Sequence, residues 1–345
     1  MVKSKEKNKI FFTLLMITLM FIANSNKVKA SDEINFKRLY GKERYETSAS
    51  ICSGGWETSE YAVLASGEGF ADALSAAPPL AKKYNAPIIL TEKNKLNDNA
   101  RTQLKNLQTK NVIIVGGIGS ISKDIETELK NLDINYSRIY GENRYETSLK
   151  IAKEIGVKNG VVITNGLGFA DALAMAPIAA SKQMSILLTP SDKLTSDTKA
   201  FLNKNSYSKS YILGGTAAVS DYIKNSLKNP TRLSGIDRFQ TNIAILNYFK
   251  QDINLDEVYI ASGSGYADAL SGSALASKNK SPIILINDNI NKDTKEFVNT
   301  NKSNFKNVTI FGGEGVVKEP TISNLFGAFK SGETRSDTKK VLQKD

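Results

Sequence analysis

The stretch that decides the fold lies at residues 65–78 and reads ASGEGFADALSAAP. It follows a short apolar run and leads into an alanine-rich segment, so it predicts a glycine loop between a strand and a helix. The same pattern returns at 164–177 as TNGLGFADALAMAP and at 261–274 as ASGSGYADALSGSA. One chain therefore carries three copies of a loop type that commonly binds phosphate or supports catalysis.

Three further signatures accompany each glycine loop. An arginine motif precedes it and reads RLYGKERYET (38–47), RIYGENRYET (138–147) and RLSGIDRFQT (232–241). Two apolar runs follow it, first APIILT (86–91), MSILLT (184–189) and SPIILI (281–286), then VIIVGG (112–117), SYILGG (210–215) and VTIFGG (308–313). Because the order is the same each time, the pattern indicates a tandem triplication, with repeats at 34–133, 134–228 and 229–330.

The fold class follows from the alternation of elements. Short apolar runs alternate with amphipathic segments such as DNARTQLKNLQ and SKDIETELKNL, which is typical of βαβ units around a parallel sheet. Each repeat is predicted to be a Rossmann-like, doubly wound α/β unit whose sheet contains the strand of its own arginine motif. The small residues after each glycine loop predict close packing of that helix against another element, which in a triplicated chain could be its counterpart in the next unit. The three units are expected to pack into one body, and the polar residues 331–345 are predicted to form a disordered tail.

The first thirty residues have the features of a secretory signal peptide. Four lysines precede the apolar run at 10–23, and VKA at 28–30 resembles a cleavage site. The alternative is an uncleaved membrane anchor, but the run is shorter than the roughly 20 apolar residues that a spanning helix needs. We therefore predict cleavage after Ala30, no later membrane span, and secretion from a Gram-positive bacterium, whose proteins are often lysine-rich and free of disulfides.

Composition limits the chemistry. The formal net charge of +11 falls to +6 if residues 1–30 are removed, which favours an anionic partner. The sequence contains no run of Lys and Arg interleaved with aromatic residues, so nucleic acid is not predicted as a partner. The chain has no histidine, which excludes Ser-His-Asp and Cys-His catalysis and histidine-bound zinc, and neither a metal nor a cofactor is predicted.

The single cysteine, Cys52, has Ala152 and Leu246 as its repeat equivalents, so it is predicted to be buried and structural.

The glycine loop departs from a dinucleotide-binding fingerprint at its third small position. Gly67 and Gly69 match the first two glycines, but Asp72 stands where the third would be, as Asp171 and Asp268 do in the other copies. A carboxylate would repel a pyrophosphate, whereas it complements the positive end of a helix. We therefore predict a structural, helix-capping role for the three aspartates. Triplication also favours multivalent binding over catalysis, because acid and base need dissimilar environments.

Two arginines recur in each arginine motif, and two interpretations of them stay open. The first set lies at the end of a strand, before the helix, and consists of Arg38, Arg138 and Arg232. The second set opens the helix and consists of Arg44, Arg144 and Arg238. They could offer fork-shaped donors to phosphate or carboxylate groups of a polymer. They could instead bind the nearby aspartate or a strand-end carbonyl, which we favour for the second set.

The four motifs together resemble the type 2 cell-wall-binding repeat of Clostridia and Bacilli over residues 34–330. The third copy departs from the pattern at Ser234 and Gln240, where the others have Tyr and Glu. The resemblance implies three Rossmann-like units in a pseudo-threefold arrangement. It also implies non-covalent anchoring to an anionic, teichoic-acid-like wall polysaccharide at the cell wall or surface layer, with other surface-layer proteins as further partners.

The resemblance further implies polymer binding at the I-L-L run. That run maps to Ile88, Ile89 and Leu90, to Ile186, Leu187 and Leu188, and to Ile283, Ile284 and Leu285. From the residues alone these are core strands, and only their C-terminal ends, beside Thr91 and Thr189, are expected near a ligand. Family members usually join the anchor to a second, active region, for which the repeats leave no room. We therefore predict a non-enzymatic anchor; the alternative is a wall-modifying enzyme or an autolysin activator without histidine chemistry.

Overall fold

The computed structural model describes residues 34–69, 72–73 and 77–327, with the backbone only at residue 77. The predicted signal peptide, the predicted tail and part of the first glycine loop lie outside these residues. Among the described helices, none has the length and hydropathy needed to cross a bilayer.

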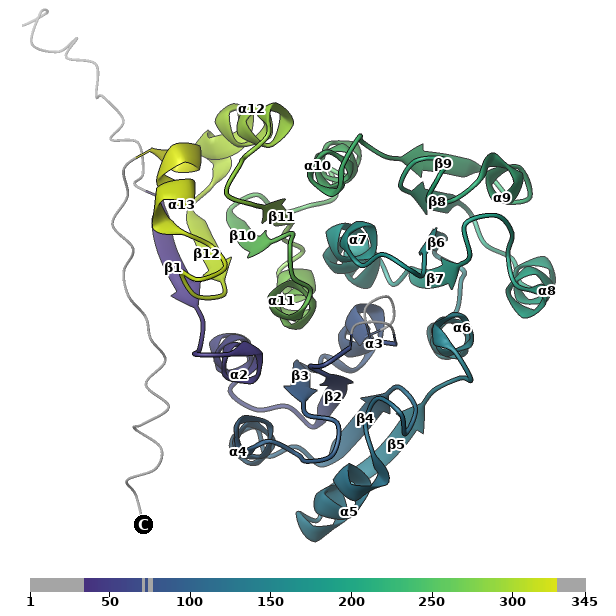
Figure 1. Ribbon diagram of the computed structural model, residues 1–345, viewed down its shortest axis with the longest axis vertical. Coiled ribbons are helices and arrows are strands. Elements are labelled where there is room, and N and C mark those ends of the chain that lie inside the picture. Colours follow the sequence, from purple (N-terminus) through teal and green to yellow (C-terminus); the bar gives the residue numbers. More distant parts are fainter. Residues whose placement is uncertain (1–33, 70–71, 74–76, 328–345) are drawn as a thin grey trace, which may run out of the picture. The chain divides into compact units, whose positions relative to one another are not determined.

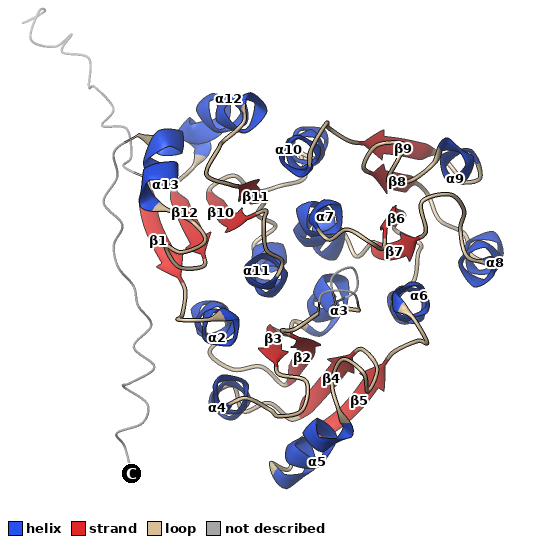
Figure 2. Ribbon diagram, viewed as in Figure 1, coloured by secondary structure: helices blue, strands red, loops and turns tan. Residues whose placement is uncertain are grey.

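The described chain forms three four-stranded sheets in which every strand pair is parallel (Figures 1 and 2). The first sheet has the order β3-β2-β4-β5, the second β7-β6-β8-β9 and the third β11-β10-β12-β1. The strands are β1 (Asn35–Leu39), β2 (Tyr61–Ser66), β3 (Ile88–Thr91), β4 (Asn111–Val115), β5 (Asn135–Ile139), β6 (Val161–Asn165), β7 (Ser185–Thr189), β8 (Ser210–Leu213), β9 (Pro230–Leu233), β10 (Glu257–Ser262), β11 (Ile283–Ile286) and β12 (Asn307–Phe311).

Helices connect the strands, as the alternating pattern predicts. They are α2 (Arg44–Gly55), α3 (Ala77–Tyr84), α4 (Asp98–Asn106), α5 (Lys123–Asn131), α6 (Arg144–Ile155), α7 (Ala170–Ser181), α8 (Ser196–Lys204), α9 (Asp221–Asn225), α10 (Arg238–Tyr248), α11 (Ala267–Lys278), α12 (Lys292–Asn301) with the 3-10 turn η1 (Lys302–Asn304), and α13 (Glu319–Phe326). Several helices begin at standard caps; for example, Asn97 and Asn291 accept hydrogen bonds from the third amide of α4 and of α12. The inner strands are buried along most of their length, because helices cover both faces.

The sheets are offset from the sequence repeats. We expected the strand of each arginine motif to join the sheet of its own repeat, and this is wrong: β5 pairs with β4 and β9 pairs with β8, so each joins the sheet of the preceding repeat. The physical reason is the short connection between α5 and β5, which completes a β4-α5-β5 crossover onto the existing sheet. Sequence similarity locates the repeats but does not say on which side of the boundary a strand pairs.

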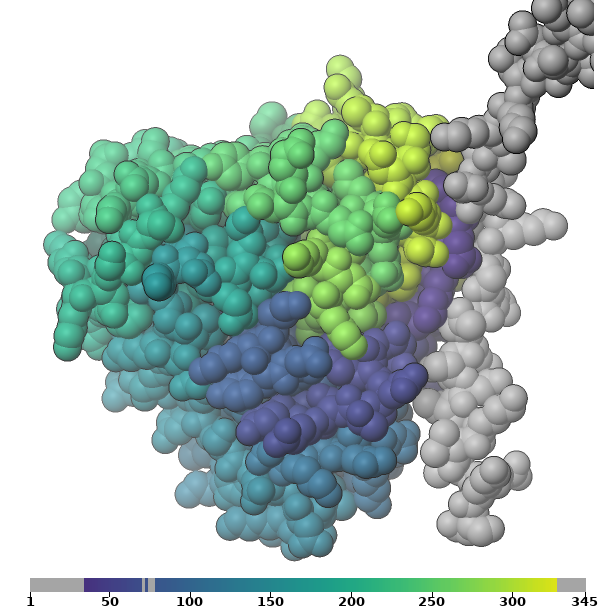
Figure 3. Space-filling view, turned by 180° about the vertical axis from the view of Figure 1, so that it is seen from behind, coloured from purple at the N-terminus to yellow at the C-terminus, as the bar shows by residue number. Residues whose placement is uncertain are grey.

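The offset closes the chain on itself. The strand β1 has no preceding repeat, and it pairs with β12 of the third repeat in the register Asn35 to Asn307 through Leu39 to Phe311. The rings of Phe36 and Phe326 also meet edge to face at 5.4 Å. The two ends of the described chain, purple and yellow in Figure 3, therefore lie side by side and complete the third sheet.

Three helices meet where the units join. These helices are α3, α7 and α11, which follow β2, β6 and β10 in the sequence and all contact one another (Figure 1). Their small side chains allow this close packing, which confirms the predicted contact between counterparts and the pseudo-threefold arrangement. One hydrophobic cluster runs through residues of all three sheets.

A lysine at the end of each central helix crosses to the neighbouring unit. Lys83 binds the Glu154 carboxylate at 2.6 Å, Lys182 binds Asp252 at 2.7 Å, and Lys278 donates to the Gly55 carbonyl at 2.6 Å. The three joins are thus chemically similar, and we call them seams: the first between repeats 1 and 2, the second between repeats 2 and 3, and the third between repeats 3 and 1.

Cys52 is buried in α2, as predicted, and burial raises the pKa of its thiol. Its equivalents Ala152 and Leu246 are also buried. The cysteine therefore fills a core position.

Candidate functional site

The arginine motif folds as a tight turn into a helix. In the first copy, the Glu43 side chain accepts hydrogen bonds from the first amides of α2, and the Glu46 carboxylate accepts from the Lys42 amide at 2.8 Å. The Thr47 hydroxyl accepts from the Gly41 amide at 3.0 Å. The same bonds recur in the second copy, so the conserved spacing within the motif is explained by capping of this turn.

The arginine that opens each helix binds the glycine loop of its own repeat. Arg44 donates to the Gly67 carbonyl, Arg144 to Gly166 at 2.7 Å and Arg238 to Gly263 at 2.8 Å. The structural interpretation, a carbonyl partner at the strand end, is therefore what the structure shows for this set. Arg44 and Arg238 keep part of their surface exposed.

The arginine within each motif strand binds the loop of the preceding unit. Arg38 donates to the carbonyls of Gly312 and Val317 at 2.8 and 2.9 Å, and it is 5% exposed. Arg138 and Arg232 make the equivalent bond to Gly116 and Gly214, at 2.9 and 2.8 Å, and each also pairs with a carboxylate. Direct contact of Arg38 with a polymer is thus blocked by burial.

The three aspartates lie at the seams. Asp171 and Asp268 occupy the first turn of α7 and α11, as expected for a carboxylate that complements a helix dipole. The N-cap residues of these helices, Phe169 and Tyr266, make no side-chain cap hydrogen bond, and a capping role of the two aspartates stays a prediction. The Asp72 carboxylate accepts from the hydroxyls of Ser120 and Thr147, each at 2.9 Å. Residues 74–76, which follow in the sequence, lie outside the described residues.

Each aspartate side chain packs against the first glycine of the Gly-Gly pair in the same sheet, and this contact contributes to its burial. A Cβ added at Gly116 would lie 3.0 Å from an Asp72 oxygen, and one at Gly214 would lie 2.7 Å from an Asp171 oxygen. Burial raises the pKa of Asp171, while Arg238 and a hydrogen bond from Thr241 oppose that rise. The carboxylate of one repeat therefore faces the arginine motif of the next.

The I-L-L run is core. All its members lie within β3, β7 and β11 and are at most 2% exposed: Ile88, Ile89, Leu90, Ile186, Leu187, Leu188, Ile283, Ile284 and Leu285. Thr91 and Thr189 are fully buried, and their hydroxyls donate to the carbonyls of Lys95 and Lys193 at 3.1 and 3.2 Å. None of these side chains is available to a polymer in this structure, which corrects the expectation of direct contact that the resemblance implied.

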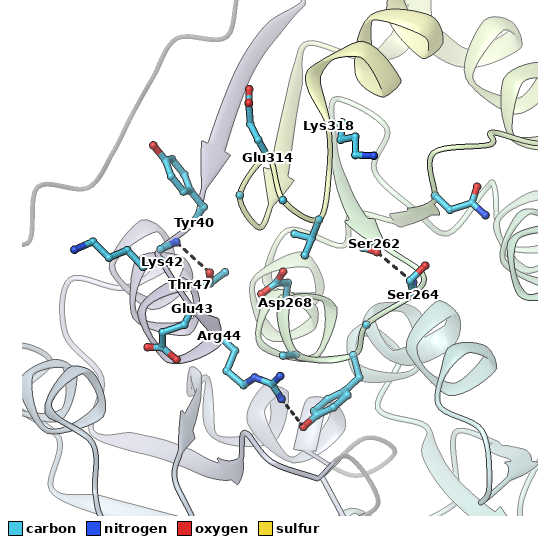
Figure 4. A pocket seen from close by; sticks show the side chains of 18 of the residues that line it. Tyr40, Lys42, Glu43, Arg44, Thr47, Ser262, Ser264, Asp268, Glu314 and Lys318 are labelled. Carbon is cyan, nitrogen blue, oxygen red and sulfur yellow. Dashed lines mark hydrogen bonds between the residues drawn. The ribbon is translucent and has the colours of Figure 1, made fainter.

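A cleft of about 910 Å³ opens at the third seam (Figure 4). One side consists of residues 40–44 and Thr47, which follow β1. The other side consists of the glycine loop after β10, residues 287–289 after β11 and residues 313–316 and 318 after β12. It lies at the carboxyl ends of the strands, at the point where the strand order reverses between β10 and β12, which is where open α/β sheets bind ligands.

The charges of the cleft nearly cancel. Its lining holds three cations, Lys42, Arg44 and Lys318, and four carboxylates, Glu43, Asp268, Asp288 and Glu314. Arg44 also donates to the Tyr266 hydroxyl at 3.2 Å, and Lys318 pairs with Asp288 at 2.6 Å. Asp268 points into the space between the two sides (Figure 4), and burial raises its pKa to about 6 against the opposing effect of Arg44.

Most of the cleft was missed at the sequence level. Only Arg44 and Asp268 of its lining were predicted as site residues, while Tyr40, Ser264, Asn289 and Glu314 were not. Tyr40 belongs to the arginine motif, whereas the other three stand at loop positions that differ between the copies, where a pattern search sees no signal. The residues after the I-L-L run differ in all three copies, reading EKN at 92–94, PSD at 190–192 and NDN at 287–289, so no sequence signal singles out the third copy.

The described chain is an α/β protein made of three fused Rossmann-like units with a cleft at the third seam. The family model described as "Cell wall binding domain 2 (CWB2)" matches residues 38–126, 138–224 and 232–322. The chain belongs to this family of cell-wall-binding proteins.

Named relatives agree with this assignment. The chain is 36% identical over 290 residues to "N-acetylmuramoyl-L-alanine amidase LytC" of Bacillus subtilis, covering 84% of this chain and 58% of the relative. It is 35% identical over 252 residues to "Amidase enhancer" of the same organism, covering 72% of this chain and 34% of the relative. The chain thus spans little more than half of the amidase and about a third of the amidase enhancer.

Solved structures share the fold. Cwp6 from Clostridium difficile superimposes with a TM-score of 0.77 at 32% identity, over 88% of this chain and 50% of that protein. Cwp8 from the same organism gives a TM-score of 0.75 at 28% identity, over 86% of this chain and 53% of that protein. The α/β class and the three-repeat architecture predicted from the sequence are confirmed.

Proposed function

We propose that the chain is a secreted protein of a Gram-positive wall that attaches non-covalently to an anionic wall polysaccharide and does not itself catalyse a reaction. The observation that carries the proposal is the match of three wall-binding repeats, which account for nearly all of the described residues. The net positive charge of the chain supports attraction to an anionic polymer.

Cosedimentation with purified Gram-positive walls tests this function. The chain from residue 31 onward is expected to sediment with walls at low salt and to be released as salt screens the attraction. Acid extraction of the phosphate-linked polymer should remove the binding. Failure to bind at low salt, or undiminished binding after extraction, would contradict the proposal.

The alternative function is modification of the wall, or activation of an enzyme that modifies it. The similarity to an amidase and to an amidase enhancer is the observation that keeps it in view. Release of soluble wall fragments by the isolated chain, measured in the same suspension, would favour an enzyme. Release only when an amidase is added would favour an activator.

A further inference from the structure

The third seam differs from the first in how its aspartate is satisfied. At the first seam, the hydroxyls of Ser120 and Thr147 donate to Asp72. Val316 takes the place of Ser120 at the third seam, four residues after the first glycine of the Gly-Gly pair in both copies. Among the described residues, no side chain or amide makes a hydrogen bond or an ion pair with Asp268. A polar group so deep in a cleft normally has a partner.

Two of the three cations that line the cleft already bind protein groups, so the cleft offers little attraction for an anion. Arg44 is bound to the Gly67 carbonyl and to Tyr266, and Lys318 is bound to Asp288. Among the remaining charged side chains that line the cleft, Glu43 caps α2. The others are the two carboxylates of Asp268 and Glu314 and the single ammonium group of Lys42, so negative charge is in excess. A phosphate placed beside Asp268 would therefore meet like charge in a poorly solvated space.

The same lining suits a group that donates hydrogen bonds and carries no charge. A carboxylate accepts up to four hydrogen bonds, and the side chains of Asn287, Asn289 and Ser264 both donate and accept. The rings of Tyr40 and Tyr266 add apolar surface with a polar edge. A volume of about 910 Å³ lies within the range of small-molecule sites.

We propose that the cleft at the third seam binds an uncharged sugar unit of the wall polymer, with Asp268 accepting hydrogen bonds from its hydroxyl groups. The proposal rests on the proposed wall-binding function and divides it in two. The net positive charge of the chain supplies salt-sensitive attraction to the charged polymer, and the cleft supplies recognition of a neutral unit. Because the cleft is built from residues near both ends of the described chain, the site exists only when β1 closes the third sheet.

Titration with neutral wall oligosaccharides tests the assignment. The probe is the mixture released from purified Gram-positive walls by hydrofluoric acid, which cleaves phosphodiesters, and binding is measured by calorimetry and saturation-transfer NMR. The chain from residue 31 onward is expected to bind with an affinity that changes little with salt. Asp268→Asn should weaken binding at least about tenfold, because a charged acceptor is lost.

Matched variants separate recognition from folding. Asp171→Asn removes the equivalent carboxylate at the second seam and should leave sugar binding unchanged. Val316→Ser gives Asp268 an internal hydroxyl like that of Ser120 and should weaken binding without loss of thermal stability. Unchanged binding by Asp268→Asn, equal loss in Asp171→Asn, or displacement of the sugar by inorganic phosphate would overturn the proposal.

Wall cosedimentation of the same samples keeps the two proposals distinguishable. If the chain sediments with walls but binds no neutral oligosaccharide, the cleft assignment fails and the anchoring function stands. If it binds neither, both fail. If Asp268→Asn loses the oligosaccharide but still binds walls weakly and with strong salt dependence, both stand.

Discussion

Gly67, Gly166 and Gly263 each lie against an aromatic ring from the arginine motif of the same repeat. A Cβ at Gly166 would stand 2.6 Å from Cε1 of Tyr145, and added carbons at the other two positions would overlap Tyr45 and Phe239. The neighbouring arginine binds the carbonyl of the same glycine. The first glycine of each loop is therefore required for helix-to-loop packing and not for a phosphate.

This contact makes Gly67→Ala and Gly69→Ala an informative pair. The first substitution forces a methyl group into the Tyr45 ring and should lower the free energy of unfolding by about 1–3 kcal/mol, the usual cost of overpacking. The second adds a methyl group with nothing within 4 Å and should change stability by less than about 0.5 kcal/mol. Denaturant unfolding of both variants measures the difference; equal effects would refute the packing role.

Asp268 gives the protein a pH-dependent stability. Its pKa of about 6, raised from the usual 3.8 by burial, means that the folded chain holds this proton more tightly than the unfolded chain. Stability should therefore fall as the pH rises from about 4 to about 6 and stay lower above that range. Asp268→Asn cannot ionise and should stabilise the free protein by roughly 1–2 kcal/mol at pH 7.5, discounted for partial solvent access, and not at pH 4.

Thermal unfolding at the two pH values measures this effect, and Asp72→Asn is its control. The Asp72 carboxylate is held by two hydroxyls, so its replacement should destabilise the chain by about 1–2 kcal/mol. A stability difference between wild type and Asp268→Asn that is the same at pH 4 and pH 7.5 would contradict the assigned ionisation. The site residue would thus reduce stability in the free protein, as binding residues often do.

At the scale of elements, the sequence predicted most strands and helices because their signals are local. The buried strands read as continuous apolar runs, and helices α4, α8 and α12 begin at Asn or Thr caps. The pairing of β1 with β12 was missed because no local pattern records which sheet a boundary strand joins. Helix packing between repeats was anticipated from the small residues of α7 and α11.

The site was less predictable than the fold. The repeated motif residues are the ones a sequence comparison singles out, and here they hold turns, loops and seams together. The cleft combines motif residues such as Arg44 and Asp268 with loop positions whose side chains differ between the copies. One such position holds Val316, where the first copy has Ser120 and the second has Ala218. A residue difference between the copies opens a cavity only if the neighbouring side chains leave space, and those neighbours belong to another repeat.

At the scale of the whole molecule, the three repeats form a closed arrangement in which repeats 3 and 1 meet without a covalent connection at the third seam. Helix α5 ends at Asn131 and β5 begins at Asn135, so three residues make the connection at the first boundary. At the third seam, Phe326 of α13 lies against Phe36 of β1 at 5.4 Å. The geometry on the two sides of the third seam therefore matches that of an intact boundary.

Circular permutation tests the equivalence of the boundaries. A chain that runs from residue 134 to 327, continues through a Leu-Asp linker copied from Leu132 and Asp133, and ends with 34–133 should fold with a stability within about 1–2 kcal/mol of the parent. The linker reproduces the native turn, in which Asp133 adopts a positive φ of 56°. Circular dichroism, thermal unfolding and wall cosedimentation check the product.

Deletion of residues 34–39 is the matched control for that permutant. It keeps the residues of every motif helix but removes β1, and it exposes β12 as an open edge. It also removes the strand that positions residues 40–44, which form one side of the cleft. It should lose both stability and neutral-sugar binding, whereas the permutant should keep both. A permutant that fails to fold would show that the order of synthesis matters; a deletion that still binds the sugar would show that the cleft does not need closure of the third sheet by β1.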